Sequence, residues 1–456
     1  MLKKLFQSLR SPLRRFPLSR STPAILSSRQ HALKRSEISR NAVNVVERLQ
    51  QAGYQAYVVG GCVRDLLLNM APKDYDVATS ATPEQVRAQF RNARVIGRRF
   101  KLVHVHFGRE IIEVATFRAN HPEDDEESSV SSRNESGRIL RDNVYGTLED
   151  DAQRRDFTIN ALYYDPSNER ILDHTHGVHD IRNRQVRLIG TPRQRYQEDP
   201  VRMLRAVRFA AKLDFEIEHH SAEPIAELSD LLLDVPAARL YDEVLKLFLA
   251  GKAEQTFDLL LEHDLFAPLF PATAEALEHE PDYTETLIRN ALANTDLRIA
   301  QGKPVTPAFL FAALLWPALP ARALELQGRG IPPIPALQEA AHDIIWEQCQ
   351  RIAIPKRFTL PMREIWDMQE RLPRRHGRRA DQLLENPRFR AGYDFLLLRE
   401  SAGERTDGLG DWWTEYQEVN DSERRSMIRA LSSREENTGA PRKRKRTGRR
   451  KRTGEQ

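Results

Sequence analysis

The chain has 456 residues, 40% of them hydrophobic, which is long enough for two to four domains with buried cores. Its net charge of +5 is uneven, because residues 1–40 carry +9 and residues 441–456 carry +8, which leaves about −12 for residues 41–440. No stretch approaches the roughly 20 apolar residues that span a bilayer, and polar residues interrupt the basic N-terminus, so an integral membrane segment and a secretory signal are both unexpected.

Two cysteines, Cys62 and Cys349, are too few for a disulfide framework or a cysteine-based zinc site, which favours a reducing, cytoplasmic location. Both chain ends are basic: residues 1–37 read as an N-terminal extension and residues 431–456 as a disordered tail. Such runs are either solvated tails or bind phosphates, on RNA or on an anionic membrane surface.

Between these ends the predicted elements fall into an α/β part and a helical part. The α/β part, residues 38–190, begins with a helix over 38–52 and a strand over 56–59, followed by a diglycine turn and a helical apolar run at 66–68. Two strands, 103–107 and 111–116, flank a turn at 108–110, and an acidic surface loop covers 120–138. From residue 199 the signals are helical, with the clearest helices at 201–213, 237–250, 255–263, 307–315 and 389–399.

Asp74 and Asp76 follow the diglycine Gly60–Gly61 and form the first chemical motif. If both lie in a strand, their carboxylates share one face, and such oxygen ligands suit Mg²⁺ together with substrate phosphates. The strand, the diglycine and the following helix bring backbone N–H groups close to a bound phosphate. These features together predict a metal-dependent enzyme that handles a nucleoside triphosphate.

A two-metal site needs carboxylates from more than one strand. Glu113 is a candidate because a charged residue in the middle of an apolar strand is costly unless it is paired or coordinates a metal. The alternative is an edge-strand Glu that faces solvent. Asp156, in the segment RRDFTINA at 154–161, reads by itself as a helix N-cap. In the segment at 198–208, Asp199 reads as an N-cap, and Arg202, Arg205 and Arg208 read as a basic helix face.

The ordered set G-G-x-V-R-D, D-x-D, RRDFTINA and E-D-x-x-R-x-x-R resembles the class II nucleotidyltransferases of the polymerase-β superfamily, the branch that holds bacterial poly(A) polymerases and CCA-adding enzymes. This resemblance, over roughly residues 38–430, implies an α/β nucleotidyltransferase head with a small mixed sheet, followed by an all-α neck and body. The expected domains are a head at 38–190, a helical neck at 191–265 that binds nucleotide and RNA, and an RNA-binding body at 266–430.

The resemblance also implies roles for individual residues. Asp74 and Asp76, with Glu113, Asp156 or both, would hold two Mg²⁺ ions, for which Mn²⁺ can substitute; Glu113 and Asp156 are both retained as candidates for the third carboxylate. Asp199 and Arg202 would read the edge of the incoming base, and Arg205 and Arg208 would face triphosphate or RNA. The remaining nucleotide-binding candidates are Gly60, Gly61, Arg64, Lys73, Arg118, Arg154, Arg155 and Asn160.

The stretches at 95–107 and 383–395 resemble the poly(A) polymerases of this family more than its CCA-adding members. The expected activity is therefore template-independent transfer of AMP from ATP to RNA 3′ ends, on messenger RNA, regulatory RNA or decay intermediates, in a context of RNA decay and its proteins. The alternatives are CCA addition to tRNA and, in another class, a non-catalytic RNA-binding adaptor. Trp412, Trp413, Tyr416 and Phe389 are expected to be core residues rather than base-stacking platforms.

Overall fold

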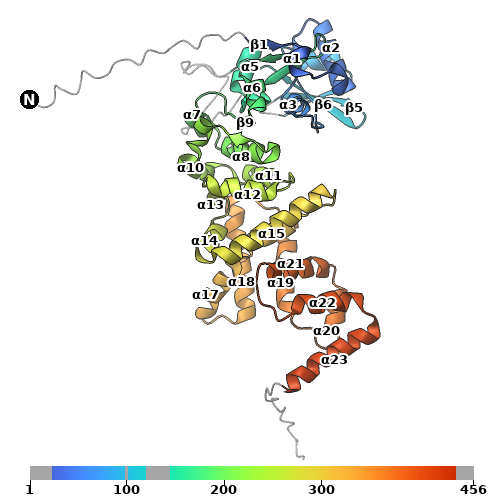
Figure 1. The fold of residues 1–456 in the computed structure, drawn as a ribbon, viewed down its shortest axis with the longest axis vertical. Coiled ribbons are helices and arrows are strands. Elements are labelled where there is room, and N and C mark those ends of the chain that lie inside the picture. The colour runs from blue at the N-terminus through green and yellow to red at the C-terminus, as the bar shows by residue number, and fades with distance from the viewer. Residues whose placement is uncertain (1–22, 98–100, 120–143, 438–456) are drawn as a thin grey trace, which may run out of the picture. The chain divides into compact units, whose positions relative to one another are not determined.

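The computed structural model describes residues 23–97, 101–119 and 144–437, and the chain divides into two compact units, residues 1–232 and 233–456 (Figure 1). The boundary lies inside the segment predicted as the neck, 191–265. The predicted acidic loop at 120–138 lies outside the described residues.

Unit 1 is built on a mixed sheet, which confirms the predicted fold class. Among the described residues, eight strands form this sheet in the order β1-β8-β7-β2-β3-β6-β5-β4. The β3–β6 pair is parallel and the other neighbours are antiparallel. The strands are β1 (Ala24–Leu26), β2 (Ala56–Val59), β3 (Asp76–Thr79), β4 (Ala93–Ile96), β5 (Leu102–Phe107), β6 (Glu110–Thr116), β7 (Leu162–Asp165) and β8 (Arg170–Asp173). A separate parallel pair joins β9 (Gln185–Val186) to β10 (Glu216–Ile217).

Amphipathic helices complete unit 1. On the long helices α2 and α8 the apolar side chains are buried, as the spacing of these residues predicts. The α-helices are α1 (Ser28–His31), α2 (Arg40–Gln51), α3 (Gly61–Leu67), α4 (Pro83–Gln89), α5 (Leu148–Arg154), α6 (Gly177–Arg182), α7 (Pro192–Glu198), α8 (Val201–Leu213), α9 (His219–Ala222) and α10 (Ile225–Leu228). The 3₁₀ helices are η1 (Arg35–Glu37), η2 (Thr158–Asn160) and η3 (Ser229–Asp234), the last of which runs across the boundary between the units.

Several local predictions for unit 1 need correction. The predicted extension at 1–37 contains β1, which pairs with β8, so the sheet begins well before residue 38. Asp74 precedes β3 rather than lying in it, because the β2–β3 ladder ends where Val59 pairs with Asp76 and the chain then turns into α3. Helix α3 begins directly at Gly61, and α8 begins at Val201 as predicted, but its N-cap is Pro200 rather than Asp199.

Unit 2 is helical throughout the part of it that the structure describes, as predicted. Its helices are α11 (Ala237–Phe248), α12 (Ala253–Glu262), α13 (Phe266–Leu269), α14 (Pro271–His279), α15 (Pro281–Ala300), α16 (Pro307–Leu315), α17 (Ala318–Gly328), α18 (Pro333–Arg351), α19 (Lys356–Arg371), α20 (Arg379–Leu384), α21 (Phe389–Ser401), α22 (Leu409–Glu418) and α23 (Asp421–Asn437). Helix α23 continues past the tail boundary predicted at residue 430.

An aromatic core closes the C-terminal part of unit 2. Phe389, Trp413 and Tyr416 are buried there, and Trp412 packs against them, which confirms that these side chains form core. Among the described residues no single helix is both long and apolar enough to cross a membrane, although the pair α16 and α17, bent by 54°, meets that criterion jointly.

Candidate active site

The parallel pairing of β3 with β6 brings two predicted carboxylates side by side. Asp76, the first residue of β3, is the register partner of Glu113 on β6. Register partners on neighbouring strands project from the same face of a sheet, so these two side chains share one face. Asp74, two residues earlier, is exposed at the entrance to the strand. The structure therefore gathers Asp74, Asp76 and Glu113 at one end of the central strands.

The negative charges of Asp74, Asp76 and Glu113 repel one another. The pKa of Asp76 is raised to about 6, mainly by burial and then by the charges of Glu113 and Asp74, while Arg155 acts in the opposite direction. Within the described residues Asp74 and Asp76 form no ion pair, and Glu113 approaches only His104, whose Nε2 lies 3.4 Å from its carboxylate. Three carboxylates that repel one another and form no ion pair with lysine or arginine in the described residues are a donor set that fits divalent cations.

Asp156, the alternative third ligand, has a very different environment. Its carboxylate accepts hydrogen bonds from Arg205 Nε at 2.7 Å, from the Phe157 N–H at 2.8 Å and from Asn160 Nδ2 at 3.3 Å. Burial by itself would raise the pKa of Asp156, but Arg205 and these hydrogen bonds hold it below its usual value. Asp156 is thus already neutralised by an arginine, whereas Glu113 is not.

Asp151, which the sequence reading missed, organises the two arginines of the RRDFTINA segment. It is 3% exposed and accepts hydrogen bonds from Arg154 Nε at 3.3 Å, from Arg155 Nη2 at 3.0 Å and from the Tyr163 hydroxyl at 2.7 Å. Burial opposes ionisation, yet Arg155 and Arg154 keep the pKa of Asp151 below its usual value. Asp151 precedes Arg154 and Arg155 by three and four residues, a spacing that indicates ion pairs on a helix and could have identified it from the sequence.

Arg155 connects this buried acid to the carboxylate group. Its guanidinium lies over the Tyr163 ring, 5.3 Å from the centroid, and it lowers the pKa of Asp76. A Cβ added to Gly60 would lie 3.7 Å from Arg155 Nη1. Arg155 is therefore held beside both the diglycine turn and the acidic group.

The diglycine turn depends on glycine at its first position. Gly60 has φ +83 and ψ −135, a backbone conformation that is essentially restricted to glycine, and its N–H donates to Leu162 O at 3.3 Å. Arg64, on the first turns of α3, is 3% exposed; its Nε donates to Asp65 at 2.9 Å and its Nη1 to Asn160 at 2.5 Å. Arg64 Nη2 would lie 3.4 Å from a Cβ on Gly61, so its charge lies directly beneath the turn.

The arginine side chains on the predicted basic face of α8 contact other residues of unit 1. Arg202 Nη1 donates to Glu198 at 3.0 Å, Arg205 binds Asp156, and Arg208 lies over the Phe209 ring at 4.9 Å. On the opposite face Leu204, Val207 and Ala211 are buried, as predicted. Arg195, another residue that the sequence reading missed, ties α7 to the end of α5 through the carbonyls of residues 154 and 155.

The other predicted residues lie near this framework. Asp199 ends α7, and its side chain accepts the Val201 N–H at 3.3 Å. Lys73 is exposed next to Asp74. Arg118 is 5% exposed, and its N–H donates to Asp151 at 3.3 Å.

Comparison with known proteins decides which family has this arrangement. The poly A polymerase head domain family matches residues 56–187, the probable RNA- and SrmB-binding site of polymerase A matches 214–277, and the arginine-rich C-terminus of polymerase A matches 329–452. Poly(A) polymerase I of Salmonella typhimurium is 48% identical over 94% of this chain and 92% of its own length. The chain belongs to the poly(A) polymerase family. Poly(A) polymerase I of Haemophilus influenzae is also similar, at 47% identity over 89% of this chain and 90% of its own length.

Members of this family are nucleotidyltransferases that act on nucleotides with divalent metal, and the acidic group of this chain fits that requirement. CCA-adding enzymes are more distant relatives: that of Lactobacillus helveticus is 36% identical over 53% of this chain and 58% of its own length. The Bacillus stearothermophilus CCA-adding enzyme in complex with CTP has a TM-score of 0.50 at 27% identity, covering 82% of this chain and 80% of its own.

Proposed function

We propose that this chain extends RNA 3′ ends with AMP from ATP, without a template, and releases pyrophosphate. The observation that carries the proposal is identity of 48% with poly(A) polymerase I along 94% of the chain, combined with the carboxylates of Asp74, Asp76 and Glu113, which form no ion pair with lysine or arginine in the described residues. In this reaction the RNA 3′-oxygen bonds to the α-phosphorus, the bond to pyrophosphate breaks, and the hydroxyl proton is lost.

Asp74, Asp76 and Glu113 are the residues that would hold Mg²⁺, because their carboxylates are close together and unneutralised. Such ions, when bound, help to deprotonate the attacking hydroxyl and balance charge on the leaving pyrophosphate. Asp156 contributes differently: it fixes Arg205 on α8 and orients Asn160 on η2. We therefore assign Asp156 a positioning role rather than a ligand role.

The triphosphate would lie against the diglycine turn. Gly60 and Gly61 leave room for close approach, Arg155 is oriented toward this space by Asp151, and Arg64 adds charge from below. Lys73, Arg118 and Arg154 are the further phosphate contacts that the family motifs imply. Asp199 and Arg202 would read the adenine edge, and Arg208 would face triphosphate or RNA. Fixed guanidinium groups are effective here because they need little reorganisation as charge moves onto the leaving group.

A nucleotide panel tests this function. Purified full-length chain with Mg²⁺ and an unstructured RNA primer should produce a long ladder with ATP and little extension with CTP, GTP or UTP. A tRNA that lacks its terminal triplet, supplied with CTP and ATP, separates the CCA-adding alternative, since only that activity would add two CMP residues and then one AMP and stop.

Two variants complete the test. Asp74→Asn together with Asp76→Asn should abolish extension while the circular dichroism spectrum stays unchanged, whereas Asp411→Asn, an exposed acid on α22, should retain it. A chain deleted beyond residue 437 should keep turnover at low salt; an RNA-binding adaptor would instead show no turnover in any form. A cytoplasmic location and association with RNA-decay proteins stay predictions.

A further inference from the structure

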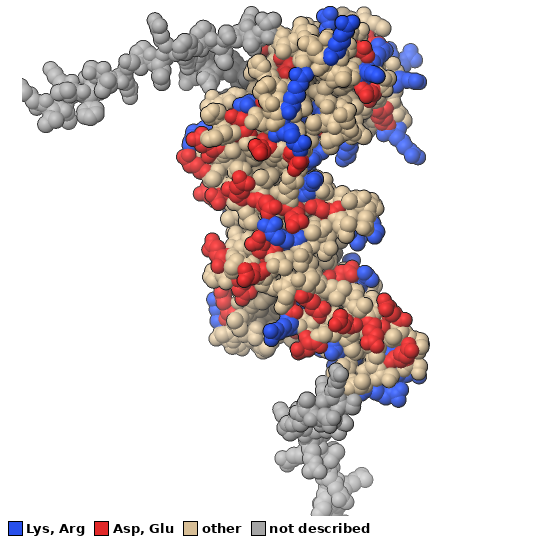
Figure 2. All heavy atoms as spheres, viewed as in Figure 1, with Lys and Arg blue, Asp and Glu red and all other residues tan. Residues whose placement is uncertain are grey.

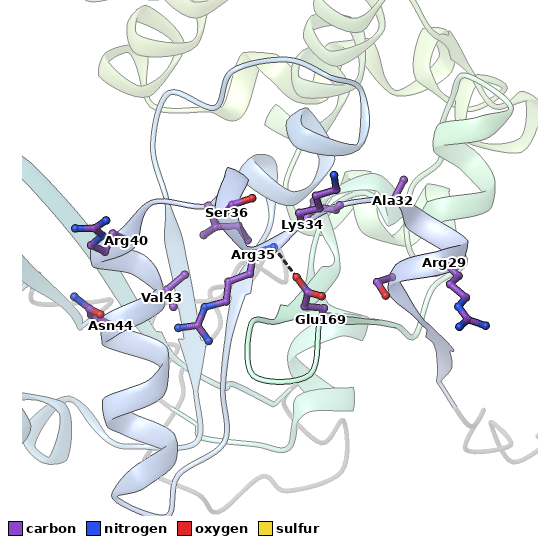
Figure 3. A pocket seen from close by; sticks show the side chains of 12 residues that line it. Arg29, Ala32, Lys34, Arg35, Ser36, Arg40, Val43, Asn44 and Glu169 are labelled. Atoms are coloured by element: carbon purple, nitrogen blue, oxygen red, sulfur yellow. Dashed lines mark hydrogen bonds between the residues drawn. The ribbon is translucent and has the colours of Figure 1, made fainter.

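The N-terminal part of unit 1 forms a hollow that is separate from the predicted site residues. Its volume is about 1020 Å³, and it is framed by α1, η1, the start of α2 and the turn between β7 and β8 (Figure 3). The residues that line it include four basic side chains and one acid, and none of the predicted site residues is among them.

Specific contacts hold this segment on the sheet. His31 Nε2 lies 3.0 Å from Glu169 O, and the Arg35 N–H donates to the Glu169 carboxylate at 2.9 Å, the bond that Figure 3 draws in the middle of the hollow. Arg182 Nη2 adds a bond of 2.8 Å to Gln30 O. The hollow therefore has a defined shape within unit 1.

Some of the charged side chains that line the hollow already have an interaction partner, and others do not. The Arg35 guanidinium pairs with Glu47 at 2.6 Å, and Glu169 is occupied by the Arg35 backbone. Arg29, Lys34 and Arg40 are exposed, and in the described part of the chain their side chains have no acidic partner. In Figure 3 Arg29 and Arg40 lie at opposite ends of the lining, with Lys34 between them.

We propose that Arg29, Lys34 and Arg40, here called the N-terminal cationic rim, bind the phosphate backbone of single-stranded RNA at nucleotides upstream of the 3′ end. The proposal rests on the proposed function, which supplies RNA as the substrate. Three unpaired cations around a concave surface match a polyanion that passes across it, and release of counterions then drives binding. No aromatic side chain is among the described residues that line the hollow, so recognition is expected to be independent of base sequence.

RNA fits this surface better than an anionic membrane does. The exposed residues between the cations include Ser28, Ser36 and Asn44, whose polar groups can bond to phosphate and ribose oxygens. A membrane-binding face would instead present several exposed large apolar side chains beside its cations, whereas the large apolar side chains that line the hollow are buried and only Ile25, in the preceding strand, is exposed among those of residues 23–44. Figure 2 shows further basic side chains over the α2, β5 and β6 part of unit 1, with acidic side chains among them, so they are not counted as part of the rim.

The rim acts on binding rather than on chemistry. Tyr75, which lies between Asp74 and Asp76, donates its hydroxyl to the backbone carbonyl of Glu37 at 3.2 Å, and this bond involves none of the three rim side chains. Loss of the rim should therefore weaken the hold on long RNA without altering extension of a primer too short to reach it.

The test uses the full-length triple variant Arg29→Gln/Lys34→Gln/Arg40→Gln. Its matched control is Arg87→Gln/Arg91→Gln/Arg109→Gln, which removes the same charge from exposed positions elsewhere on unit 1. Fluorescence anisotropy without ATP measures affinity for an unstructured RNA of about 40 nucleotides between about 50 and 200 mM salt. Each phosphate contact contributes about 0.7 to the slope of log affinity against log salt, so the rim variant should lose about 2 from that slope and the control should not.

Extension assays and vesicles supply the remaining outcomes. The rim variant should have a raised KM for the long RNA and an unchanged kcat/KM for a primer of about 6 nucleotides, which is near the smallest single-strand site sizes. An unchanged salt slope, an equal loss in the control, or a loss confined to binding of phosphatidylserine vesicles would each overturn the proposal. If the wild-type chain extends no primer at all, the proposed function fails instead, and the anisotropy comparison still decides whether the rim binds RNA.

Discussion

At the scale of single residues, Asp76 and Asp156 show how environment separates two carboxylates of the same type. Asp76 lies among acids and its pKa is raised to about 6, whereas Asp156 is matched by Arg205 and its pKa is lowered. The sequence could not separate Asp156 from Glu113 as third ligand, because Arg205 lies 49 residues after Asp156 and only the fold brings them together. Glu113 was recognisable because it interrupts an apolar strand.

Replacing Asp76 by Asn should stabilise the chain when metal is removed with EDTA. A carboxyl group whose pKa rises on folding contributes stability only at low pH, and that contribution is lost as pH rises from about 4 to 6. Asn keeps the shape without the charge, so at pH 7 the variant should be more stable by about 1–2 kcal/mol. Urea unfolding should show this difference at pH 7 and little difference at pH 4; equal stabilities at both pH values would contradict it.

Asp151→Asn should impair turnover and stability together. The change leaves two arginines and a tyrosine hydroxyl around a neutral side chain, and breaking a buried pair in this way costs about 3–5 kcal/mol. Since Arg155 is no longer oriented, kcat should fall at least about tenfold, which corresponds to about 1.4 kcal/mol. Asp150→Asn is the matched control, because Asp150 only caps α5 through Thr147; comparable losses in both variants would show that Asp151 has no special role.

At the scale of elements, the strand–diglycine–helix junction and the helices with regular apolar spacing were predictable. The helices at 201–213 and 307–315 have the predicted bounds, and the strand at 56–59 does too. Strand β1 was not predictable, since three residues in a basic, proline-containing segment carry no periodic signal and gain their order only by pairing with β8. The prediction that Asp74 lies in a strand was wrong for a related reason. The first residue of β3 is set by the end of its partner β2, which the sequence of β3 alone does not reveal.

Gly60→Ala should lower both stability and turnover. A side chain at φ +83 and ψ −135 costs about 1–3 kcal/mol of strain, and relaxation of the turn would displace it from Arg155. Gly53→Ala provides the control, because Gly53 also has positive φ, at +88, but a Cβ there meets nothing within 4 Å. Thermal unfolding should report losses in both variants, whereas primer extension should fall only for Gly60→Ala; intact extension in that variant would argue against a phosphate site at the turn.

At the scale of the whole molecule, the two compact units have separate cores. The sheet and its helices form one, and the aromatic group around Trp413 belongs to the other. The order of an α/β part before a helical part was evident from composition and spacing. The division at residue 232 was not, because the helices on either side of it have the same amphipathic pattern and only three-dimensional packing assigns them to units.

Trp413→Ala should therefore unfold unit 2 selectively. Trp413 is fully buried, and its Nε1 donates to Leu372 O at 3.2 Å, so truncation should cost about 3–5 kcal/mol. Calorimetry should show one shifted transition and one unshifted transition, and proteolysis should cut first within residues 233–437. Trp346→Ala, at a side chain 59% exposed, should shift neither; a single transition that moves as a whole would contradict the independence of the two cores.

The most direct test of the metal assignment is Mn²⁺ binding followed by electron paramagnetic resonance on three variants. Asp76→Asn and Glu113→Gln should each weaken Mn²⁺ binding at least tenfold, which corresponds to about 1.4 kcal/mol, while Asp156→Asn should bind Mn²⁺ as the wild type does and lose turnover through displacement of Arg205. Normal binding by Glu113→Gln together with lost binding by Asp156→Asn would contradict the assignment.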